Sequence, residues 1–520
     1  MKQRIYKVMG VMMLSIATLS SCDKGFEEIN TDPINIRETT PDKLMSNAIV
    51  TSLTAGMMRN RNFNNELMQV TVAQSEADGT VFRYDYRRTY ADYLWNNWYV
   101  QINNLKDMEA LAKETATANK SYEAIALILQ SWLFANLTDT YGDVPYSQAA
   151  QGKSGLLEPK FDAQKDIYQG MFTTLEKANT LLTAGPAISA ASDPVFKGDI
   201  TKWRKFGNSL YLRLLLRTSG KADLAATNIA KIKQIVDTSP ATYPIMASNA
   251  DAATVRWTGE TGTSALTNPY VNGVRAQDFR SPAIASFFID HLIAWQDPRI
   301  STATADGYVV QGVNRWGIAG SAGIPSGYTP GSSPTKQAYF YSNEVSVSSV
   351  VVGAKSLQQS PLTGILMNYA EVQFILSEAA LKGWITSIAP DVAYNRGVAS
   401  SINYWVPSFP ASGTDPKVVT YLSNADMDWD PTATVDTKME LIHLQKYYAL
   451  FLVDMQQWFE YRRTGHPILP KGPGLRNGGV MPARIQYPVY VQSANPSSYQ
   501  AAVARQGADE LNTNVWWQKP

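Results

Sequence analysis

Apolar residues at helical spacing are the feature that most limits the folds open to this chain, and they occur in two separate regions. Within residues 121–137, Ile125, Ile128 and Leu129 stand three or four positions apart, and the pattern continues through Trp132. That spacing places them on one face of an amphipathic helix. The same reasoning predicts helices at 161–182 and 202–217 in the first region and at 370–382 and 437–459 in the second, the last opened by a capping-box match at Thr437.

The composition changes between and after these regions. Residues 241–360 are rich in Gly, Ser, Thr, Pro and Asn, and the pattern there supports one helix, at 282–295, and a strand at 345–352. Loops this long are uncommon unless they carry function. The sequence therefore predicts a mainly α fold of tetratricopeptide-like helical pairs. We expect a single domain over 41–520 that is helical at 41–240 and 361–466, loop-rich at 241–360 and irregular at 467–520.

The first residues have the layout of a bacterial lipoprotein signal. Lys2, Arg4 and Lys7 are basic, and residues 8–19 form an apolar run that is too short to span a bilayer. The sequence Leu-Ser-Ser-Cys follows and ends at Cys22, the one cysteine of the chain. This pattern resembles a lipobox, in which the cysteine carries acyl chains and becomes the mature N-terminus. We expect a signal peptide at 1–21, then lipidated Cys22 and a polar tether at 22–40; an ordinary secretory signal is the alternative.

Charge and motif searches disfavour several classes of function. The chain has 46 Lys and Arg against 45 Asp and Glu with no long run of one sign, so nothing favours nucleic-acid binding. One cysteine cannot form an internal disulfide or a cysteine-rich metal site. The sequence also lacks nucleotide-binding, zinc-protease and nucleophile-elbow motifs. We therefore expect no cofactor and no enzymatic activity.

Two groups of acidic residues could form sites, and in both the structural interpretation is favoured. Asp426, Asp428 and Asp430 alternate as in a calcium loop but lack its Gly and distal Glu, which favours a capped turn over a structural Ca²⁺. Glu371 and Glu378 share one face of a predicted helix, so they point the same way and cannot flank a scissile bond. The histidines are scattered in sequence and are predicted to be surface or packing residues: His291, His443 and His466.

Aromatic residues outside the predicted helical faces are the candidate ligand contacts. Trp95, Trp98 and Tyr99 fall at helical spacing and are expected to pack the first helix pair. A sugar is recognised by a flat ring that stacks on its C–H face and by neighbouring Asn, Asp or Arg. For every candidate, the alternatives are packing within the fold and contact with a partner protein. The candidates are Tyr84, Asp85, Tyr86, Trp257, Tyr270, Tyr308, Asn314, Arg315, Trp316 and Tyr328, and exposure is also expected of Tyr339 and Tyr341.

Short motifs follow one another in a fixed order along most of the chain. Residues 26–33 read FEEINTDP, residues 139–146 read DTYGDVPY, and residues 202–213 read KWRKFGNSLYLR. DPR stands at 297–299, a helix with AE and EAA at 370–380, and QQWFEYRRTG at 456–465. In this order the motifs resemble the SusD/RagB family, within it the SusD-like branch with tetratricopeptide-type helices. Gly207 stands where the family's helix usually has Ala.

The resemblance implies a scaffold of tetratricopeptide-like helix pairs with the loop-rich part packed on it. It also implies a lipid anchor at the outer membrane, exposure at the cell surface, and a TonB-dependent SusC-like barrel as the partner. The implied ligand is an oligosaccharide, and a peptide is the alternative. Two further alternatives stay open. A lid without ligand affinity would show no ring-lined concavity, and an enzyme would need clustered perturbed acids in a pocket.

Overall fold

A computed structural model describes residues 39–75, 79–258, 262–300, 310–311, 323–332, 334–342 and 356–519. The predicted signal peptide and Cys22 lie outside these residues, as do nearly all of the tether and the predicted strand at 345–352. From Pro41 onward the chain forms one compact unit, which contains every helix and strand that the structure describes.

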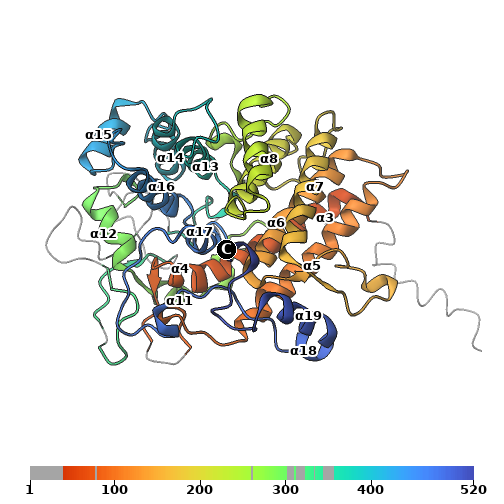
Figure 1. The fold of residues 1–520 in the computed structure, drawn as a ribbon, viewed down its shortest axis with the longest axis horizontal. Helices are drawn as coiled ribbons and strands as arrows, with labels where there is room; N and C mark the ends of the chain where they lie inside the picture. Colours follow the sequence, from red (N-terminus) through yellow and green to blue (C-terminus); the bar gives the residue numbers. More distant parts are fainter. Residues whose placement is uncertain are drawn as a thin grey trace, which may run out of the picture. The chain divides into compact units, whose positions relative to one another are not determined.

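The first region folds into helices that pack side by side, coloured orange to yellow-green in Figure 1. Each helix contacts the next in the series α3 (Pro41–Arg59), α5 (Tyr90–Leu111), α6 (Lys120–Tyr141), α7 (Gln164–Leu182), α8 (Ile200–Arg217) and α9 (Ala225–Lys233). α6 is the central member, because it is buried from Ser121 to Tyr141. A helix that is apolar on nearly every side has to be enclosed by others. The helices predicted at 121–137 and 202–217 are confirmed, and the one predicted at 161–182 begins later, at Gln164, because Phe161 and Asp162 form a strand.

The second region supplies α13 (Tyr369–Leu381), α14 (Pro390–Trp405), α15 (Pro416–Asn424), α16 (Val435–Ala449) and α17 (Gln456–Thr464). α13 packs against α14 and α16, and it also contacts α8 of the first region. Figure 1 shows α13 and α8 as neighbours in the upper half of the view. α13 therefore joins the two helical sets, which confirms a mainly α, tetratricopeptide-like scaffold.

The predicted helix at 437–459 is wrong in two respects. Its N-cap is Thr434, whose hydroxyl accepts from the Thr437 N–H, so Thr437 does not open the helix. The helix ends at Ala449, and the chain turns before α17 through Leu452 and Asp454, with φ of 63° and 38°. The turn is fixed by tertiary bonds, because the Asp454 carboxylate accepts from Trp132 and Asn136 on α6. The spacing of apolar residues in the sequence does not reveal those hydrogen-bond partners.

The loop-rich region contains short elements that pair with the scaffold. Strands β1 (Thr71–Val72) and β5 (Ala283–Ile284) are antiparallel partners. The helix predicted at 282–295 therefore begins later than expected, as α12 (Ser286–Ala294), because its first residues are taken by β5. The other pairs are β2 (Val144–Pro145) with β3 (Phe161–Asp162), β4 (Ala253–Val255) with β8 (Gly364–Met367), and β6 (Val310–Gln311) with β7 (Tyr339–Phe340).

Short helices complete the chain. Two of them, η1 (Asn60–Asn64), a π-helical turn, and α4 (Asn65–Leu67), continue directly from α3. The remaining α-helices are α10 (Pro269–Gly273), α11 (Ala276–Arg280), α18 (Val491–Ala494) and α19 (Pro496–Gln506). The remaining short turns are η2 (Val81–Arg83), η3 (Gly152–Ser154), η4 (Gln234–Thr238), η5 (Asn249–Asp251), η6 (Pro298–Ile300), η7 (Asn477–Gly479) and η8 (Trp516–Gln518).

Buried ion pairs connect the helices. Arg213 on α8 holds Glu371 on α13 through two hydrogen bonds of 2.6 Å. Arg463 on α17 similarly holds Glu378 on α13, at 2.9 and 2.6 Å. These bonds agree with the structural interpretation of the two glutamates. The turn at 139–146 is structural in the same way, and Gly142 has the positive φ, 87°, that favours glycine there.

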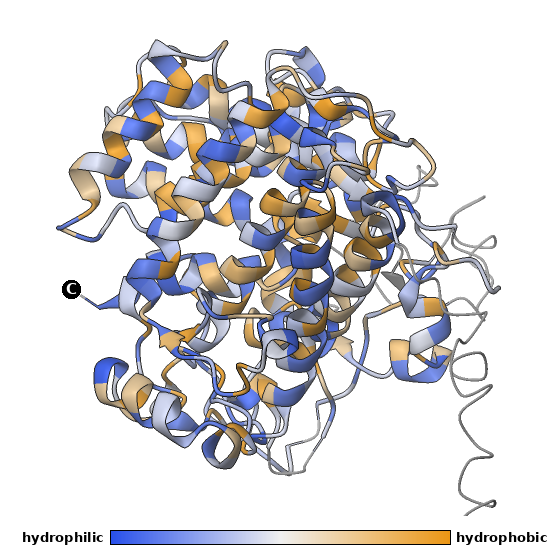
Figure 2. Ribbon diagram, turned by 90° about the vertical axis from the view of Figure 1, so that its right-hand side faces the viewer, coloured by the Kyte–Doolittle hydropathy of each residue, from blue (hydrophilic) through white to orange (hydrophobic). Residues whose placement is uncertain are grey.

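The distribution of hydropathy fits an apolar helical core enclosed by amphipathic helices. In Figure 2, orange gathers on helices in the middle of the unit, and the outer helices alternate orange with blue. Such alternation turns one face of each helix toward its neighbours. As far as the chain is described, each helix is too short or too polar to traverse a bilayer.

Candidate functional site

The aromatic residues proposed from the sequence are buried wherever the structure describes them. Tyr84, Tyr86, Trp257, Tyr270 and Tyr328 are between 1% and 7% exposed. The expectation of exposed rings is therefore wrong for the central residues Trp257, Tyr270 and Tyr328. It is also wrong for Tyr341, while Tyr339 is partly exposed. Four candidates lie outside the described residues: Tyr308, Asn314, Arg315 and Trp316.

The burial has a physical reason, because these segments fold back onto the rest of the unit, where the hydroxyls of Tyr86 and Tyr270 find backbone acceptors. Tyr86 donates to the Arg484 carbonyl at 2.6 Å, and Tyr270 donates to the Met57 carbonyl at 3.1 Å. A tyrosine that is satisfied in this way belongs to the packing of the fold. Asp85 is partly exposed and accepts from the Gly79 N–H at 3.1 Å, which closes a local turn.

Two tyrosines that the sequence reasoning did not select are partly exposed at the start of α5. Tyr90 and Tyr93 are about one helical turn apart on α5, and both are partly exposed beside the buried Leu94. The guanidinium of Arg59, at the end of α3, lies 4.8 Å from the ring centroid of each. We call Arg59, Tyr90 and Tyr93 the tyrosine–arginine face.

Neighbouring side chains hold this face in place and extend it. Phe63 packs under Tyr90 with ring centroids 6.0 Å apart. Arg59 Nη1 donates to Asn62 Oδ1 at 3.4 Å, and its buried Nε has no hydrogen-bond partner in the part of the chain that is described. Further along α5, Asn96 accepts from the hydroxyl of Tyr490, a ring that is 42% exposed. Flat rings, amides and a guanidinium with a free N–H are the groups that recognise a polyol.

Burial also sets the charges around the face. It raises the pKa of the Tyr90 and Tyr93 hydroxyls above their ordinary value, so both rings are neutral at physiological pH. It raises the pKa of the Glu66 carboxyl, close to Tyr90, to about 8, against the opposing effects of the Phe82 N–H and Arg61. Among the described residues, no carboxylate forms an ion pair with Arg59. The face is therefore a cation between neutral rings.

One cluster elsewhere has the composition of a metal site. Ligand atoms of Glu378, His443 and Glu460 lie within 4.8 Å of one another in the buried interior. Cations already hold the carboxylates, because Arg463 bonds to both and Lys446 lies 2.7 Å from Glu460. Burial lowers the pKa of His443 to about 4, although the two glutamates oppose this. The cluster acts as an ion-pair network that joins α13, α16 and α17.

The alternating aspartates at 426–430 behave as the capped turn that the sequence favoured. All three side chains are exposed, and Asp430 Oδ1 accepts from both the N–H and the hydroxyl of Thr432, each at 2.7 Å. Asp426 has a φ of 54°, which marks the tight bend after α15. The Asp430 carboxylate is therefore hydrogen-bonded within the turn itself.

Comparison with known proteins gives one family and many related folds. The model of a family described as SusD-like, "starch-binding associating with outer membrane", matches residues 33–488. No curated protein matches the sequence. Solved structures that resemble the chain include a chitin-binding protein, with 23% identity over 92% of this chain and 100% of that one and a TM-score of 0.70.

Two others extend the comparison. A SusD homolog from Bacteroides uniformis has 22% identity over 93% of this chain and 100% of that one, with a TM-score of 0.72. A chitin-binding SusD homolog from Flavobacterium johnsoniae has 19% identity over 92% of this chain and 98% of that one, with a TM-score of 0.73. At these identities the structures establish the shared fold.

Proposed function

This chain belongs to the SusD-like family of starch-binding proteins that associate with the outer membrane, and on that premise we propose that it captures oligosaccharide for a TonB-dependent, SusC-like barrel. The observation that carries the proposal is the tyrosine–arginine face, where Arg59 lies 4.8 Å from two partly exposed rings. The two solved relatives described as chitin-binding also support a glycan ligand. The protein would bind its ligand without cleaving it.

The chemistry of the face suits a sugar unit. The apolar C–H face of a pyranose can lie against the Tyr93 or Tyr90 ring, and its hydroxyls can accept from the terminal N–H groups of the Arg59 guanidinium. Both tyrosine hydroxyls are neutral and can donate or accept. A partly desolvated guanidinium makes stronger hydrogen bonds than one in bulk water, because the local dielectric is low.

Delivery would follow from closure of the protein over its transporter. Ligand binding shifts an open-to-closed equilibrium only if the ligand makes better contacts in the closed state. A partly exposed face can gain such contacts from a partner surface that covers it. We propose that acyl chains on Cys22 hold the protein at the outer membrane, exposed at the cell surface, so that capture and closure happen at the same place.

Tyr93→Ala should weaken glycan binding about tenfold, because one stacking ring is removed and the Arg59 guanidinium loses a neighbour. Titration calorimetry of the chain from Asp23 onward, against a panel of oligosaccharides and a peptide digest, measures this. Trp384→Ala is the matched control: it also removes a partly exposed ring under a cation, with Lys382 at 4.8 Å, on the α13 side of the scaffold. Heat from peptides alone would replace the glycan proposal with peptide capture.

Cys22→Ala should abolish acylation and leave the protein outside the membrane fraction, because Cys22 is the one thiol of the chain. Metabolic labelling with a fatty-acid analogue, followed by membrane fractionation, measures both effects. Ser21→Ala keeps the cysteine and a small residue before it, and it should be labelled like the parent chain. Labelling of the Cys22→Ala variant would exclude the lipobox assignment.

A further inference from the structure

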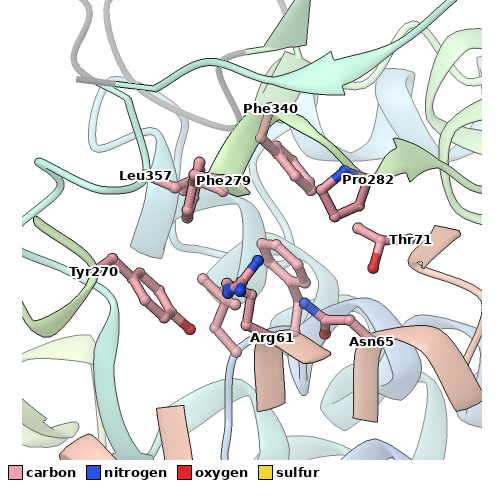
Figure 3. A pocket seen from close by; sticks show the side chains of 10 residues that line it. Arg61, Asn65, Thr71, Tyr270, Phe279, Pro282, Phe340 and Leu357 are labelled. Atoms are coloured by element: carbon pink, nitrogen blue, oxygen red, sulfur yellow. The ribbon is translucent and has the colours of Figure 1, made fainter. Parts of the chain in front are cut away.

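A small cavity lies between the scaffold and the loop-rich region, and Arg61 of the π-helical turn η1 lines it (Figure 3). Its lining has two sides. Arg61, Asn65 and Thr71 come from the η1, α4 and β1 segments, whereas the apolar side consists mainly of rings and Leu357. Figure 3 shows Phe279, Phe340 and Leu357 across the cavity from Asn65, with the Tyr270 hydroxyl pointing inward.

The polar side of the cavity is unsatisfied. Arg61 Nε, Asn65 Oδ1 and Thr71 Oγ1 are all buried, and none of the three has a hydrogen-bond partner among the described residues. Asn65 and Thr71 are only 3% and 6% exposed, so bulk water does not reach them freely. Buried polar atoms are nearly always hydrogen-bonded in folded proteins. Three exceptions on one wall therefore indicate an occupant that supplies both a donor and an acceptor.

The size of the cavity limits that occupant. Its volume is about 30 Å³, which is room for about two water molecules or a group of about three or four heavy atoms. A whole pyranose ring does not fit. The group must also present an apolar surface to the rings. An acetamido group meets each requirement, because it has a methyl, a carbonyl acceptor and one N–H donor.

We propose that this cavity binds the acetamido group of an N-acetylated sugar, an inference that rests on the proposed glycan capture. The carbonyl oxygen accepts from Arg61 Nε–H, the amide N–H donates to Asn65 Oδ1 or Thr71 Oγ1, and the methyl lies against Phe340 and Phe279. Arg61 and Pro282 are the partly exposed lining residues and mark the side where the cavity meets the surface. The Arg61 charge acts on Tyr90, where it opposes the rise in the pKa of the hydroxyl that burial causes, so the cavity lies near the tyrosine–arginine face.

Two ligands that differ only in the acetamido group distinguish this proposal from the proposed capture of oligosaccharide in general. Chitotetraose and cellotetraose share a β-1,4-linked glucose backbone and differ by an acetamido group in place of the 2-hydroxyl. Calorimetry on the chain from Asp23 onward should show chitotetraose binding about tenfold more tightly, as one satisfied buried amide implies. Asn65→Leu and the isosteric Thr71→Val should each reduce that preference to about threefold or less, with cellotetraose binding unchanged. Tyr93→Ala should lower the affinity for both tetraoses by the same factor.

Each contrary result has a distinct meaning. Equal binding of the two tetraoses would overturn the acetamido assignment and leave the cavity to water, while glycan capture would stand. A preference that survives both cavity variants would place the acetamido group elsewhere. Binding of neither tetraose would overturn the assignment as well, and the wider oligosaccharide panel would then decide the proposed function independently. Thermal unfolding of Thr71→Val, which changes no side-chain volume appreciably, verifies that the cavity variants are folded.

Discussion

Glu371→Gln is expected to destabilise the protein by about 3–5 kcal/mol, because it leaves the Arg213 guanidinium buried without its counter-charge. The Arg213 and Glu371 side chains are only 3% and 2% exposed, and two hydrogen bonds of 2.6 Å join them. The pair also ties α8 to α13 and thereby joins the two helical sets. Denaturant unfolding at pH 7 measures the loss, and thermal unfolding should show a matching fall in Tm.

An exposed pair provides the matched control. Arg275 and Asp278 form the same two-bond arrangement at 2.7 and 3.1 Å, but their side chains are 74% and 42% exposed. Asp278→Asn should therefore change the free energy of unfolding by about 1 kcal/mol or less. The double variant Arg213→Met, Glu371→Leu should recover most of the lost stability, because it removes both buried charges. Equal losses in Glu371→Gln and Asp278→Asn would contradict the role assigned to burial.

Asp454→Asn is expected to gain stability over the parent chain as pH rises, by about 2 kcal/mol between pH 4 and pH 7. Burial raises the pKa of the Asp454 carboxyl to about 6, although the Trp132 N–H, Arg213 and Asn136 oppose this. The folded protein therefore holds this proton more tightly than the unfolded chain does. The stabilisation that this proton gives to the folded parent protein is fully present below the unfolded pKa near 4. It is lost as pH rises through the folded pKa of about 6.

The measured quantity is the difference in unfolding free energy between Asp454→Asn and the parent chain at each pH. The substitution also places an amide NH₂ where Asp454 Oδ1 has no partner in the described part of the chain, and this has a free-energy cost of its own. The cost of burying this amide does not depend on pH. It therefore cancels when the stability difference at pH 4 is subtracted from that at pH 7. Denaturant unfolding of both proteins at pH 4, 5, 6 and 7 gives the difference directly. A constant difference across the range would mean that Asp454 titrates as an ordinary surface carboxyl, and the buried turn would need another explanation.

The helical scaffold and its family could be predicted from the sequence because both depend on local signals. The spacing of Ile125, Ile128 and Leu129 already implies one helical face. The motifs from 139–146 to 456–465 can be recognised in order along the chain, although their ion pairs, such as Arg217 with Asp139, join residues far apart in the sequence. Burial of Trp95 and Trp98 was predicted correctly from their helical spacing.

The rings selected from the sequence as ligand contacts are covered by the fold wherever the structure describes them, except Tyr339. Aromatic and amide residues were expected, but the choice fell on rings that the fold covers, such as Tyr270 and Tyr328. The spacing of Tyr90 and Tyr93 could have shown that they lie about one turn apart on one side of a helix. No sequence signal could bring Arg59 to them, because that contact depends on how the end of α3 packs beside α5.

The sequence by itself determined the helices, the lipobox pattern at Cys22 and membership of a binding-protein family. The tertiary structure alone decided where the helix after Thr434 breaks and which tyrosines stay at the surface. It also brought Arg61, Asn65 and Thr71 to one cavity wall opposite Phe340, a residue distant in sequence. The reason is physical: periodicity reports which side of an element is apolar, whereas exposure and unsatisfied polar atoms depend on what packs against that side.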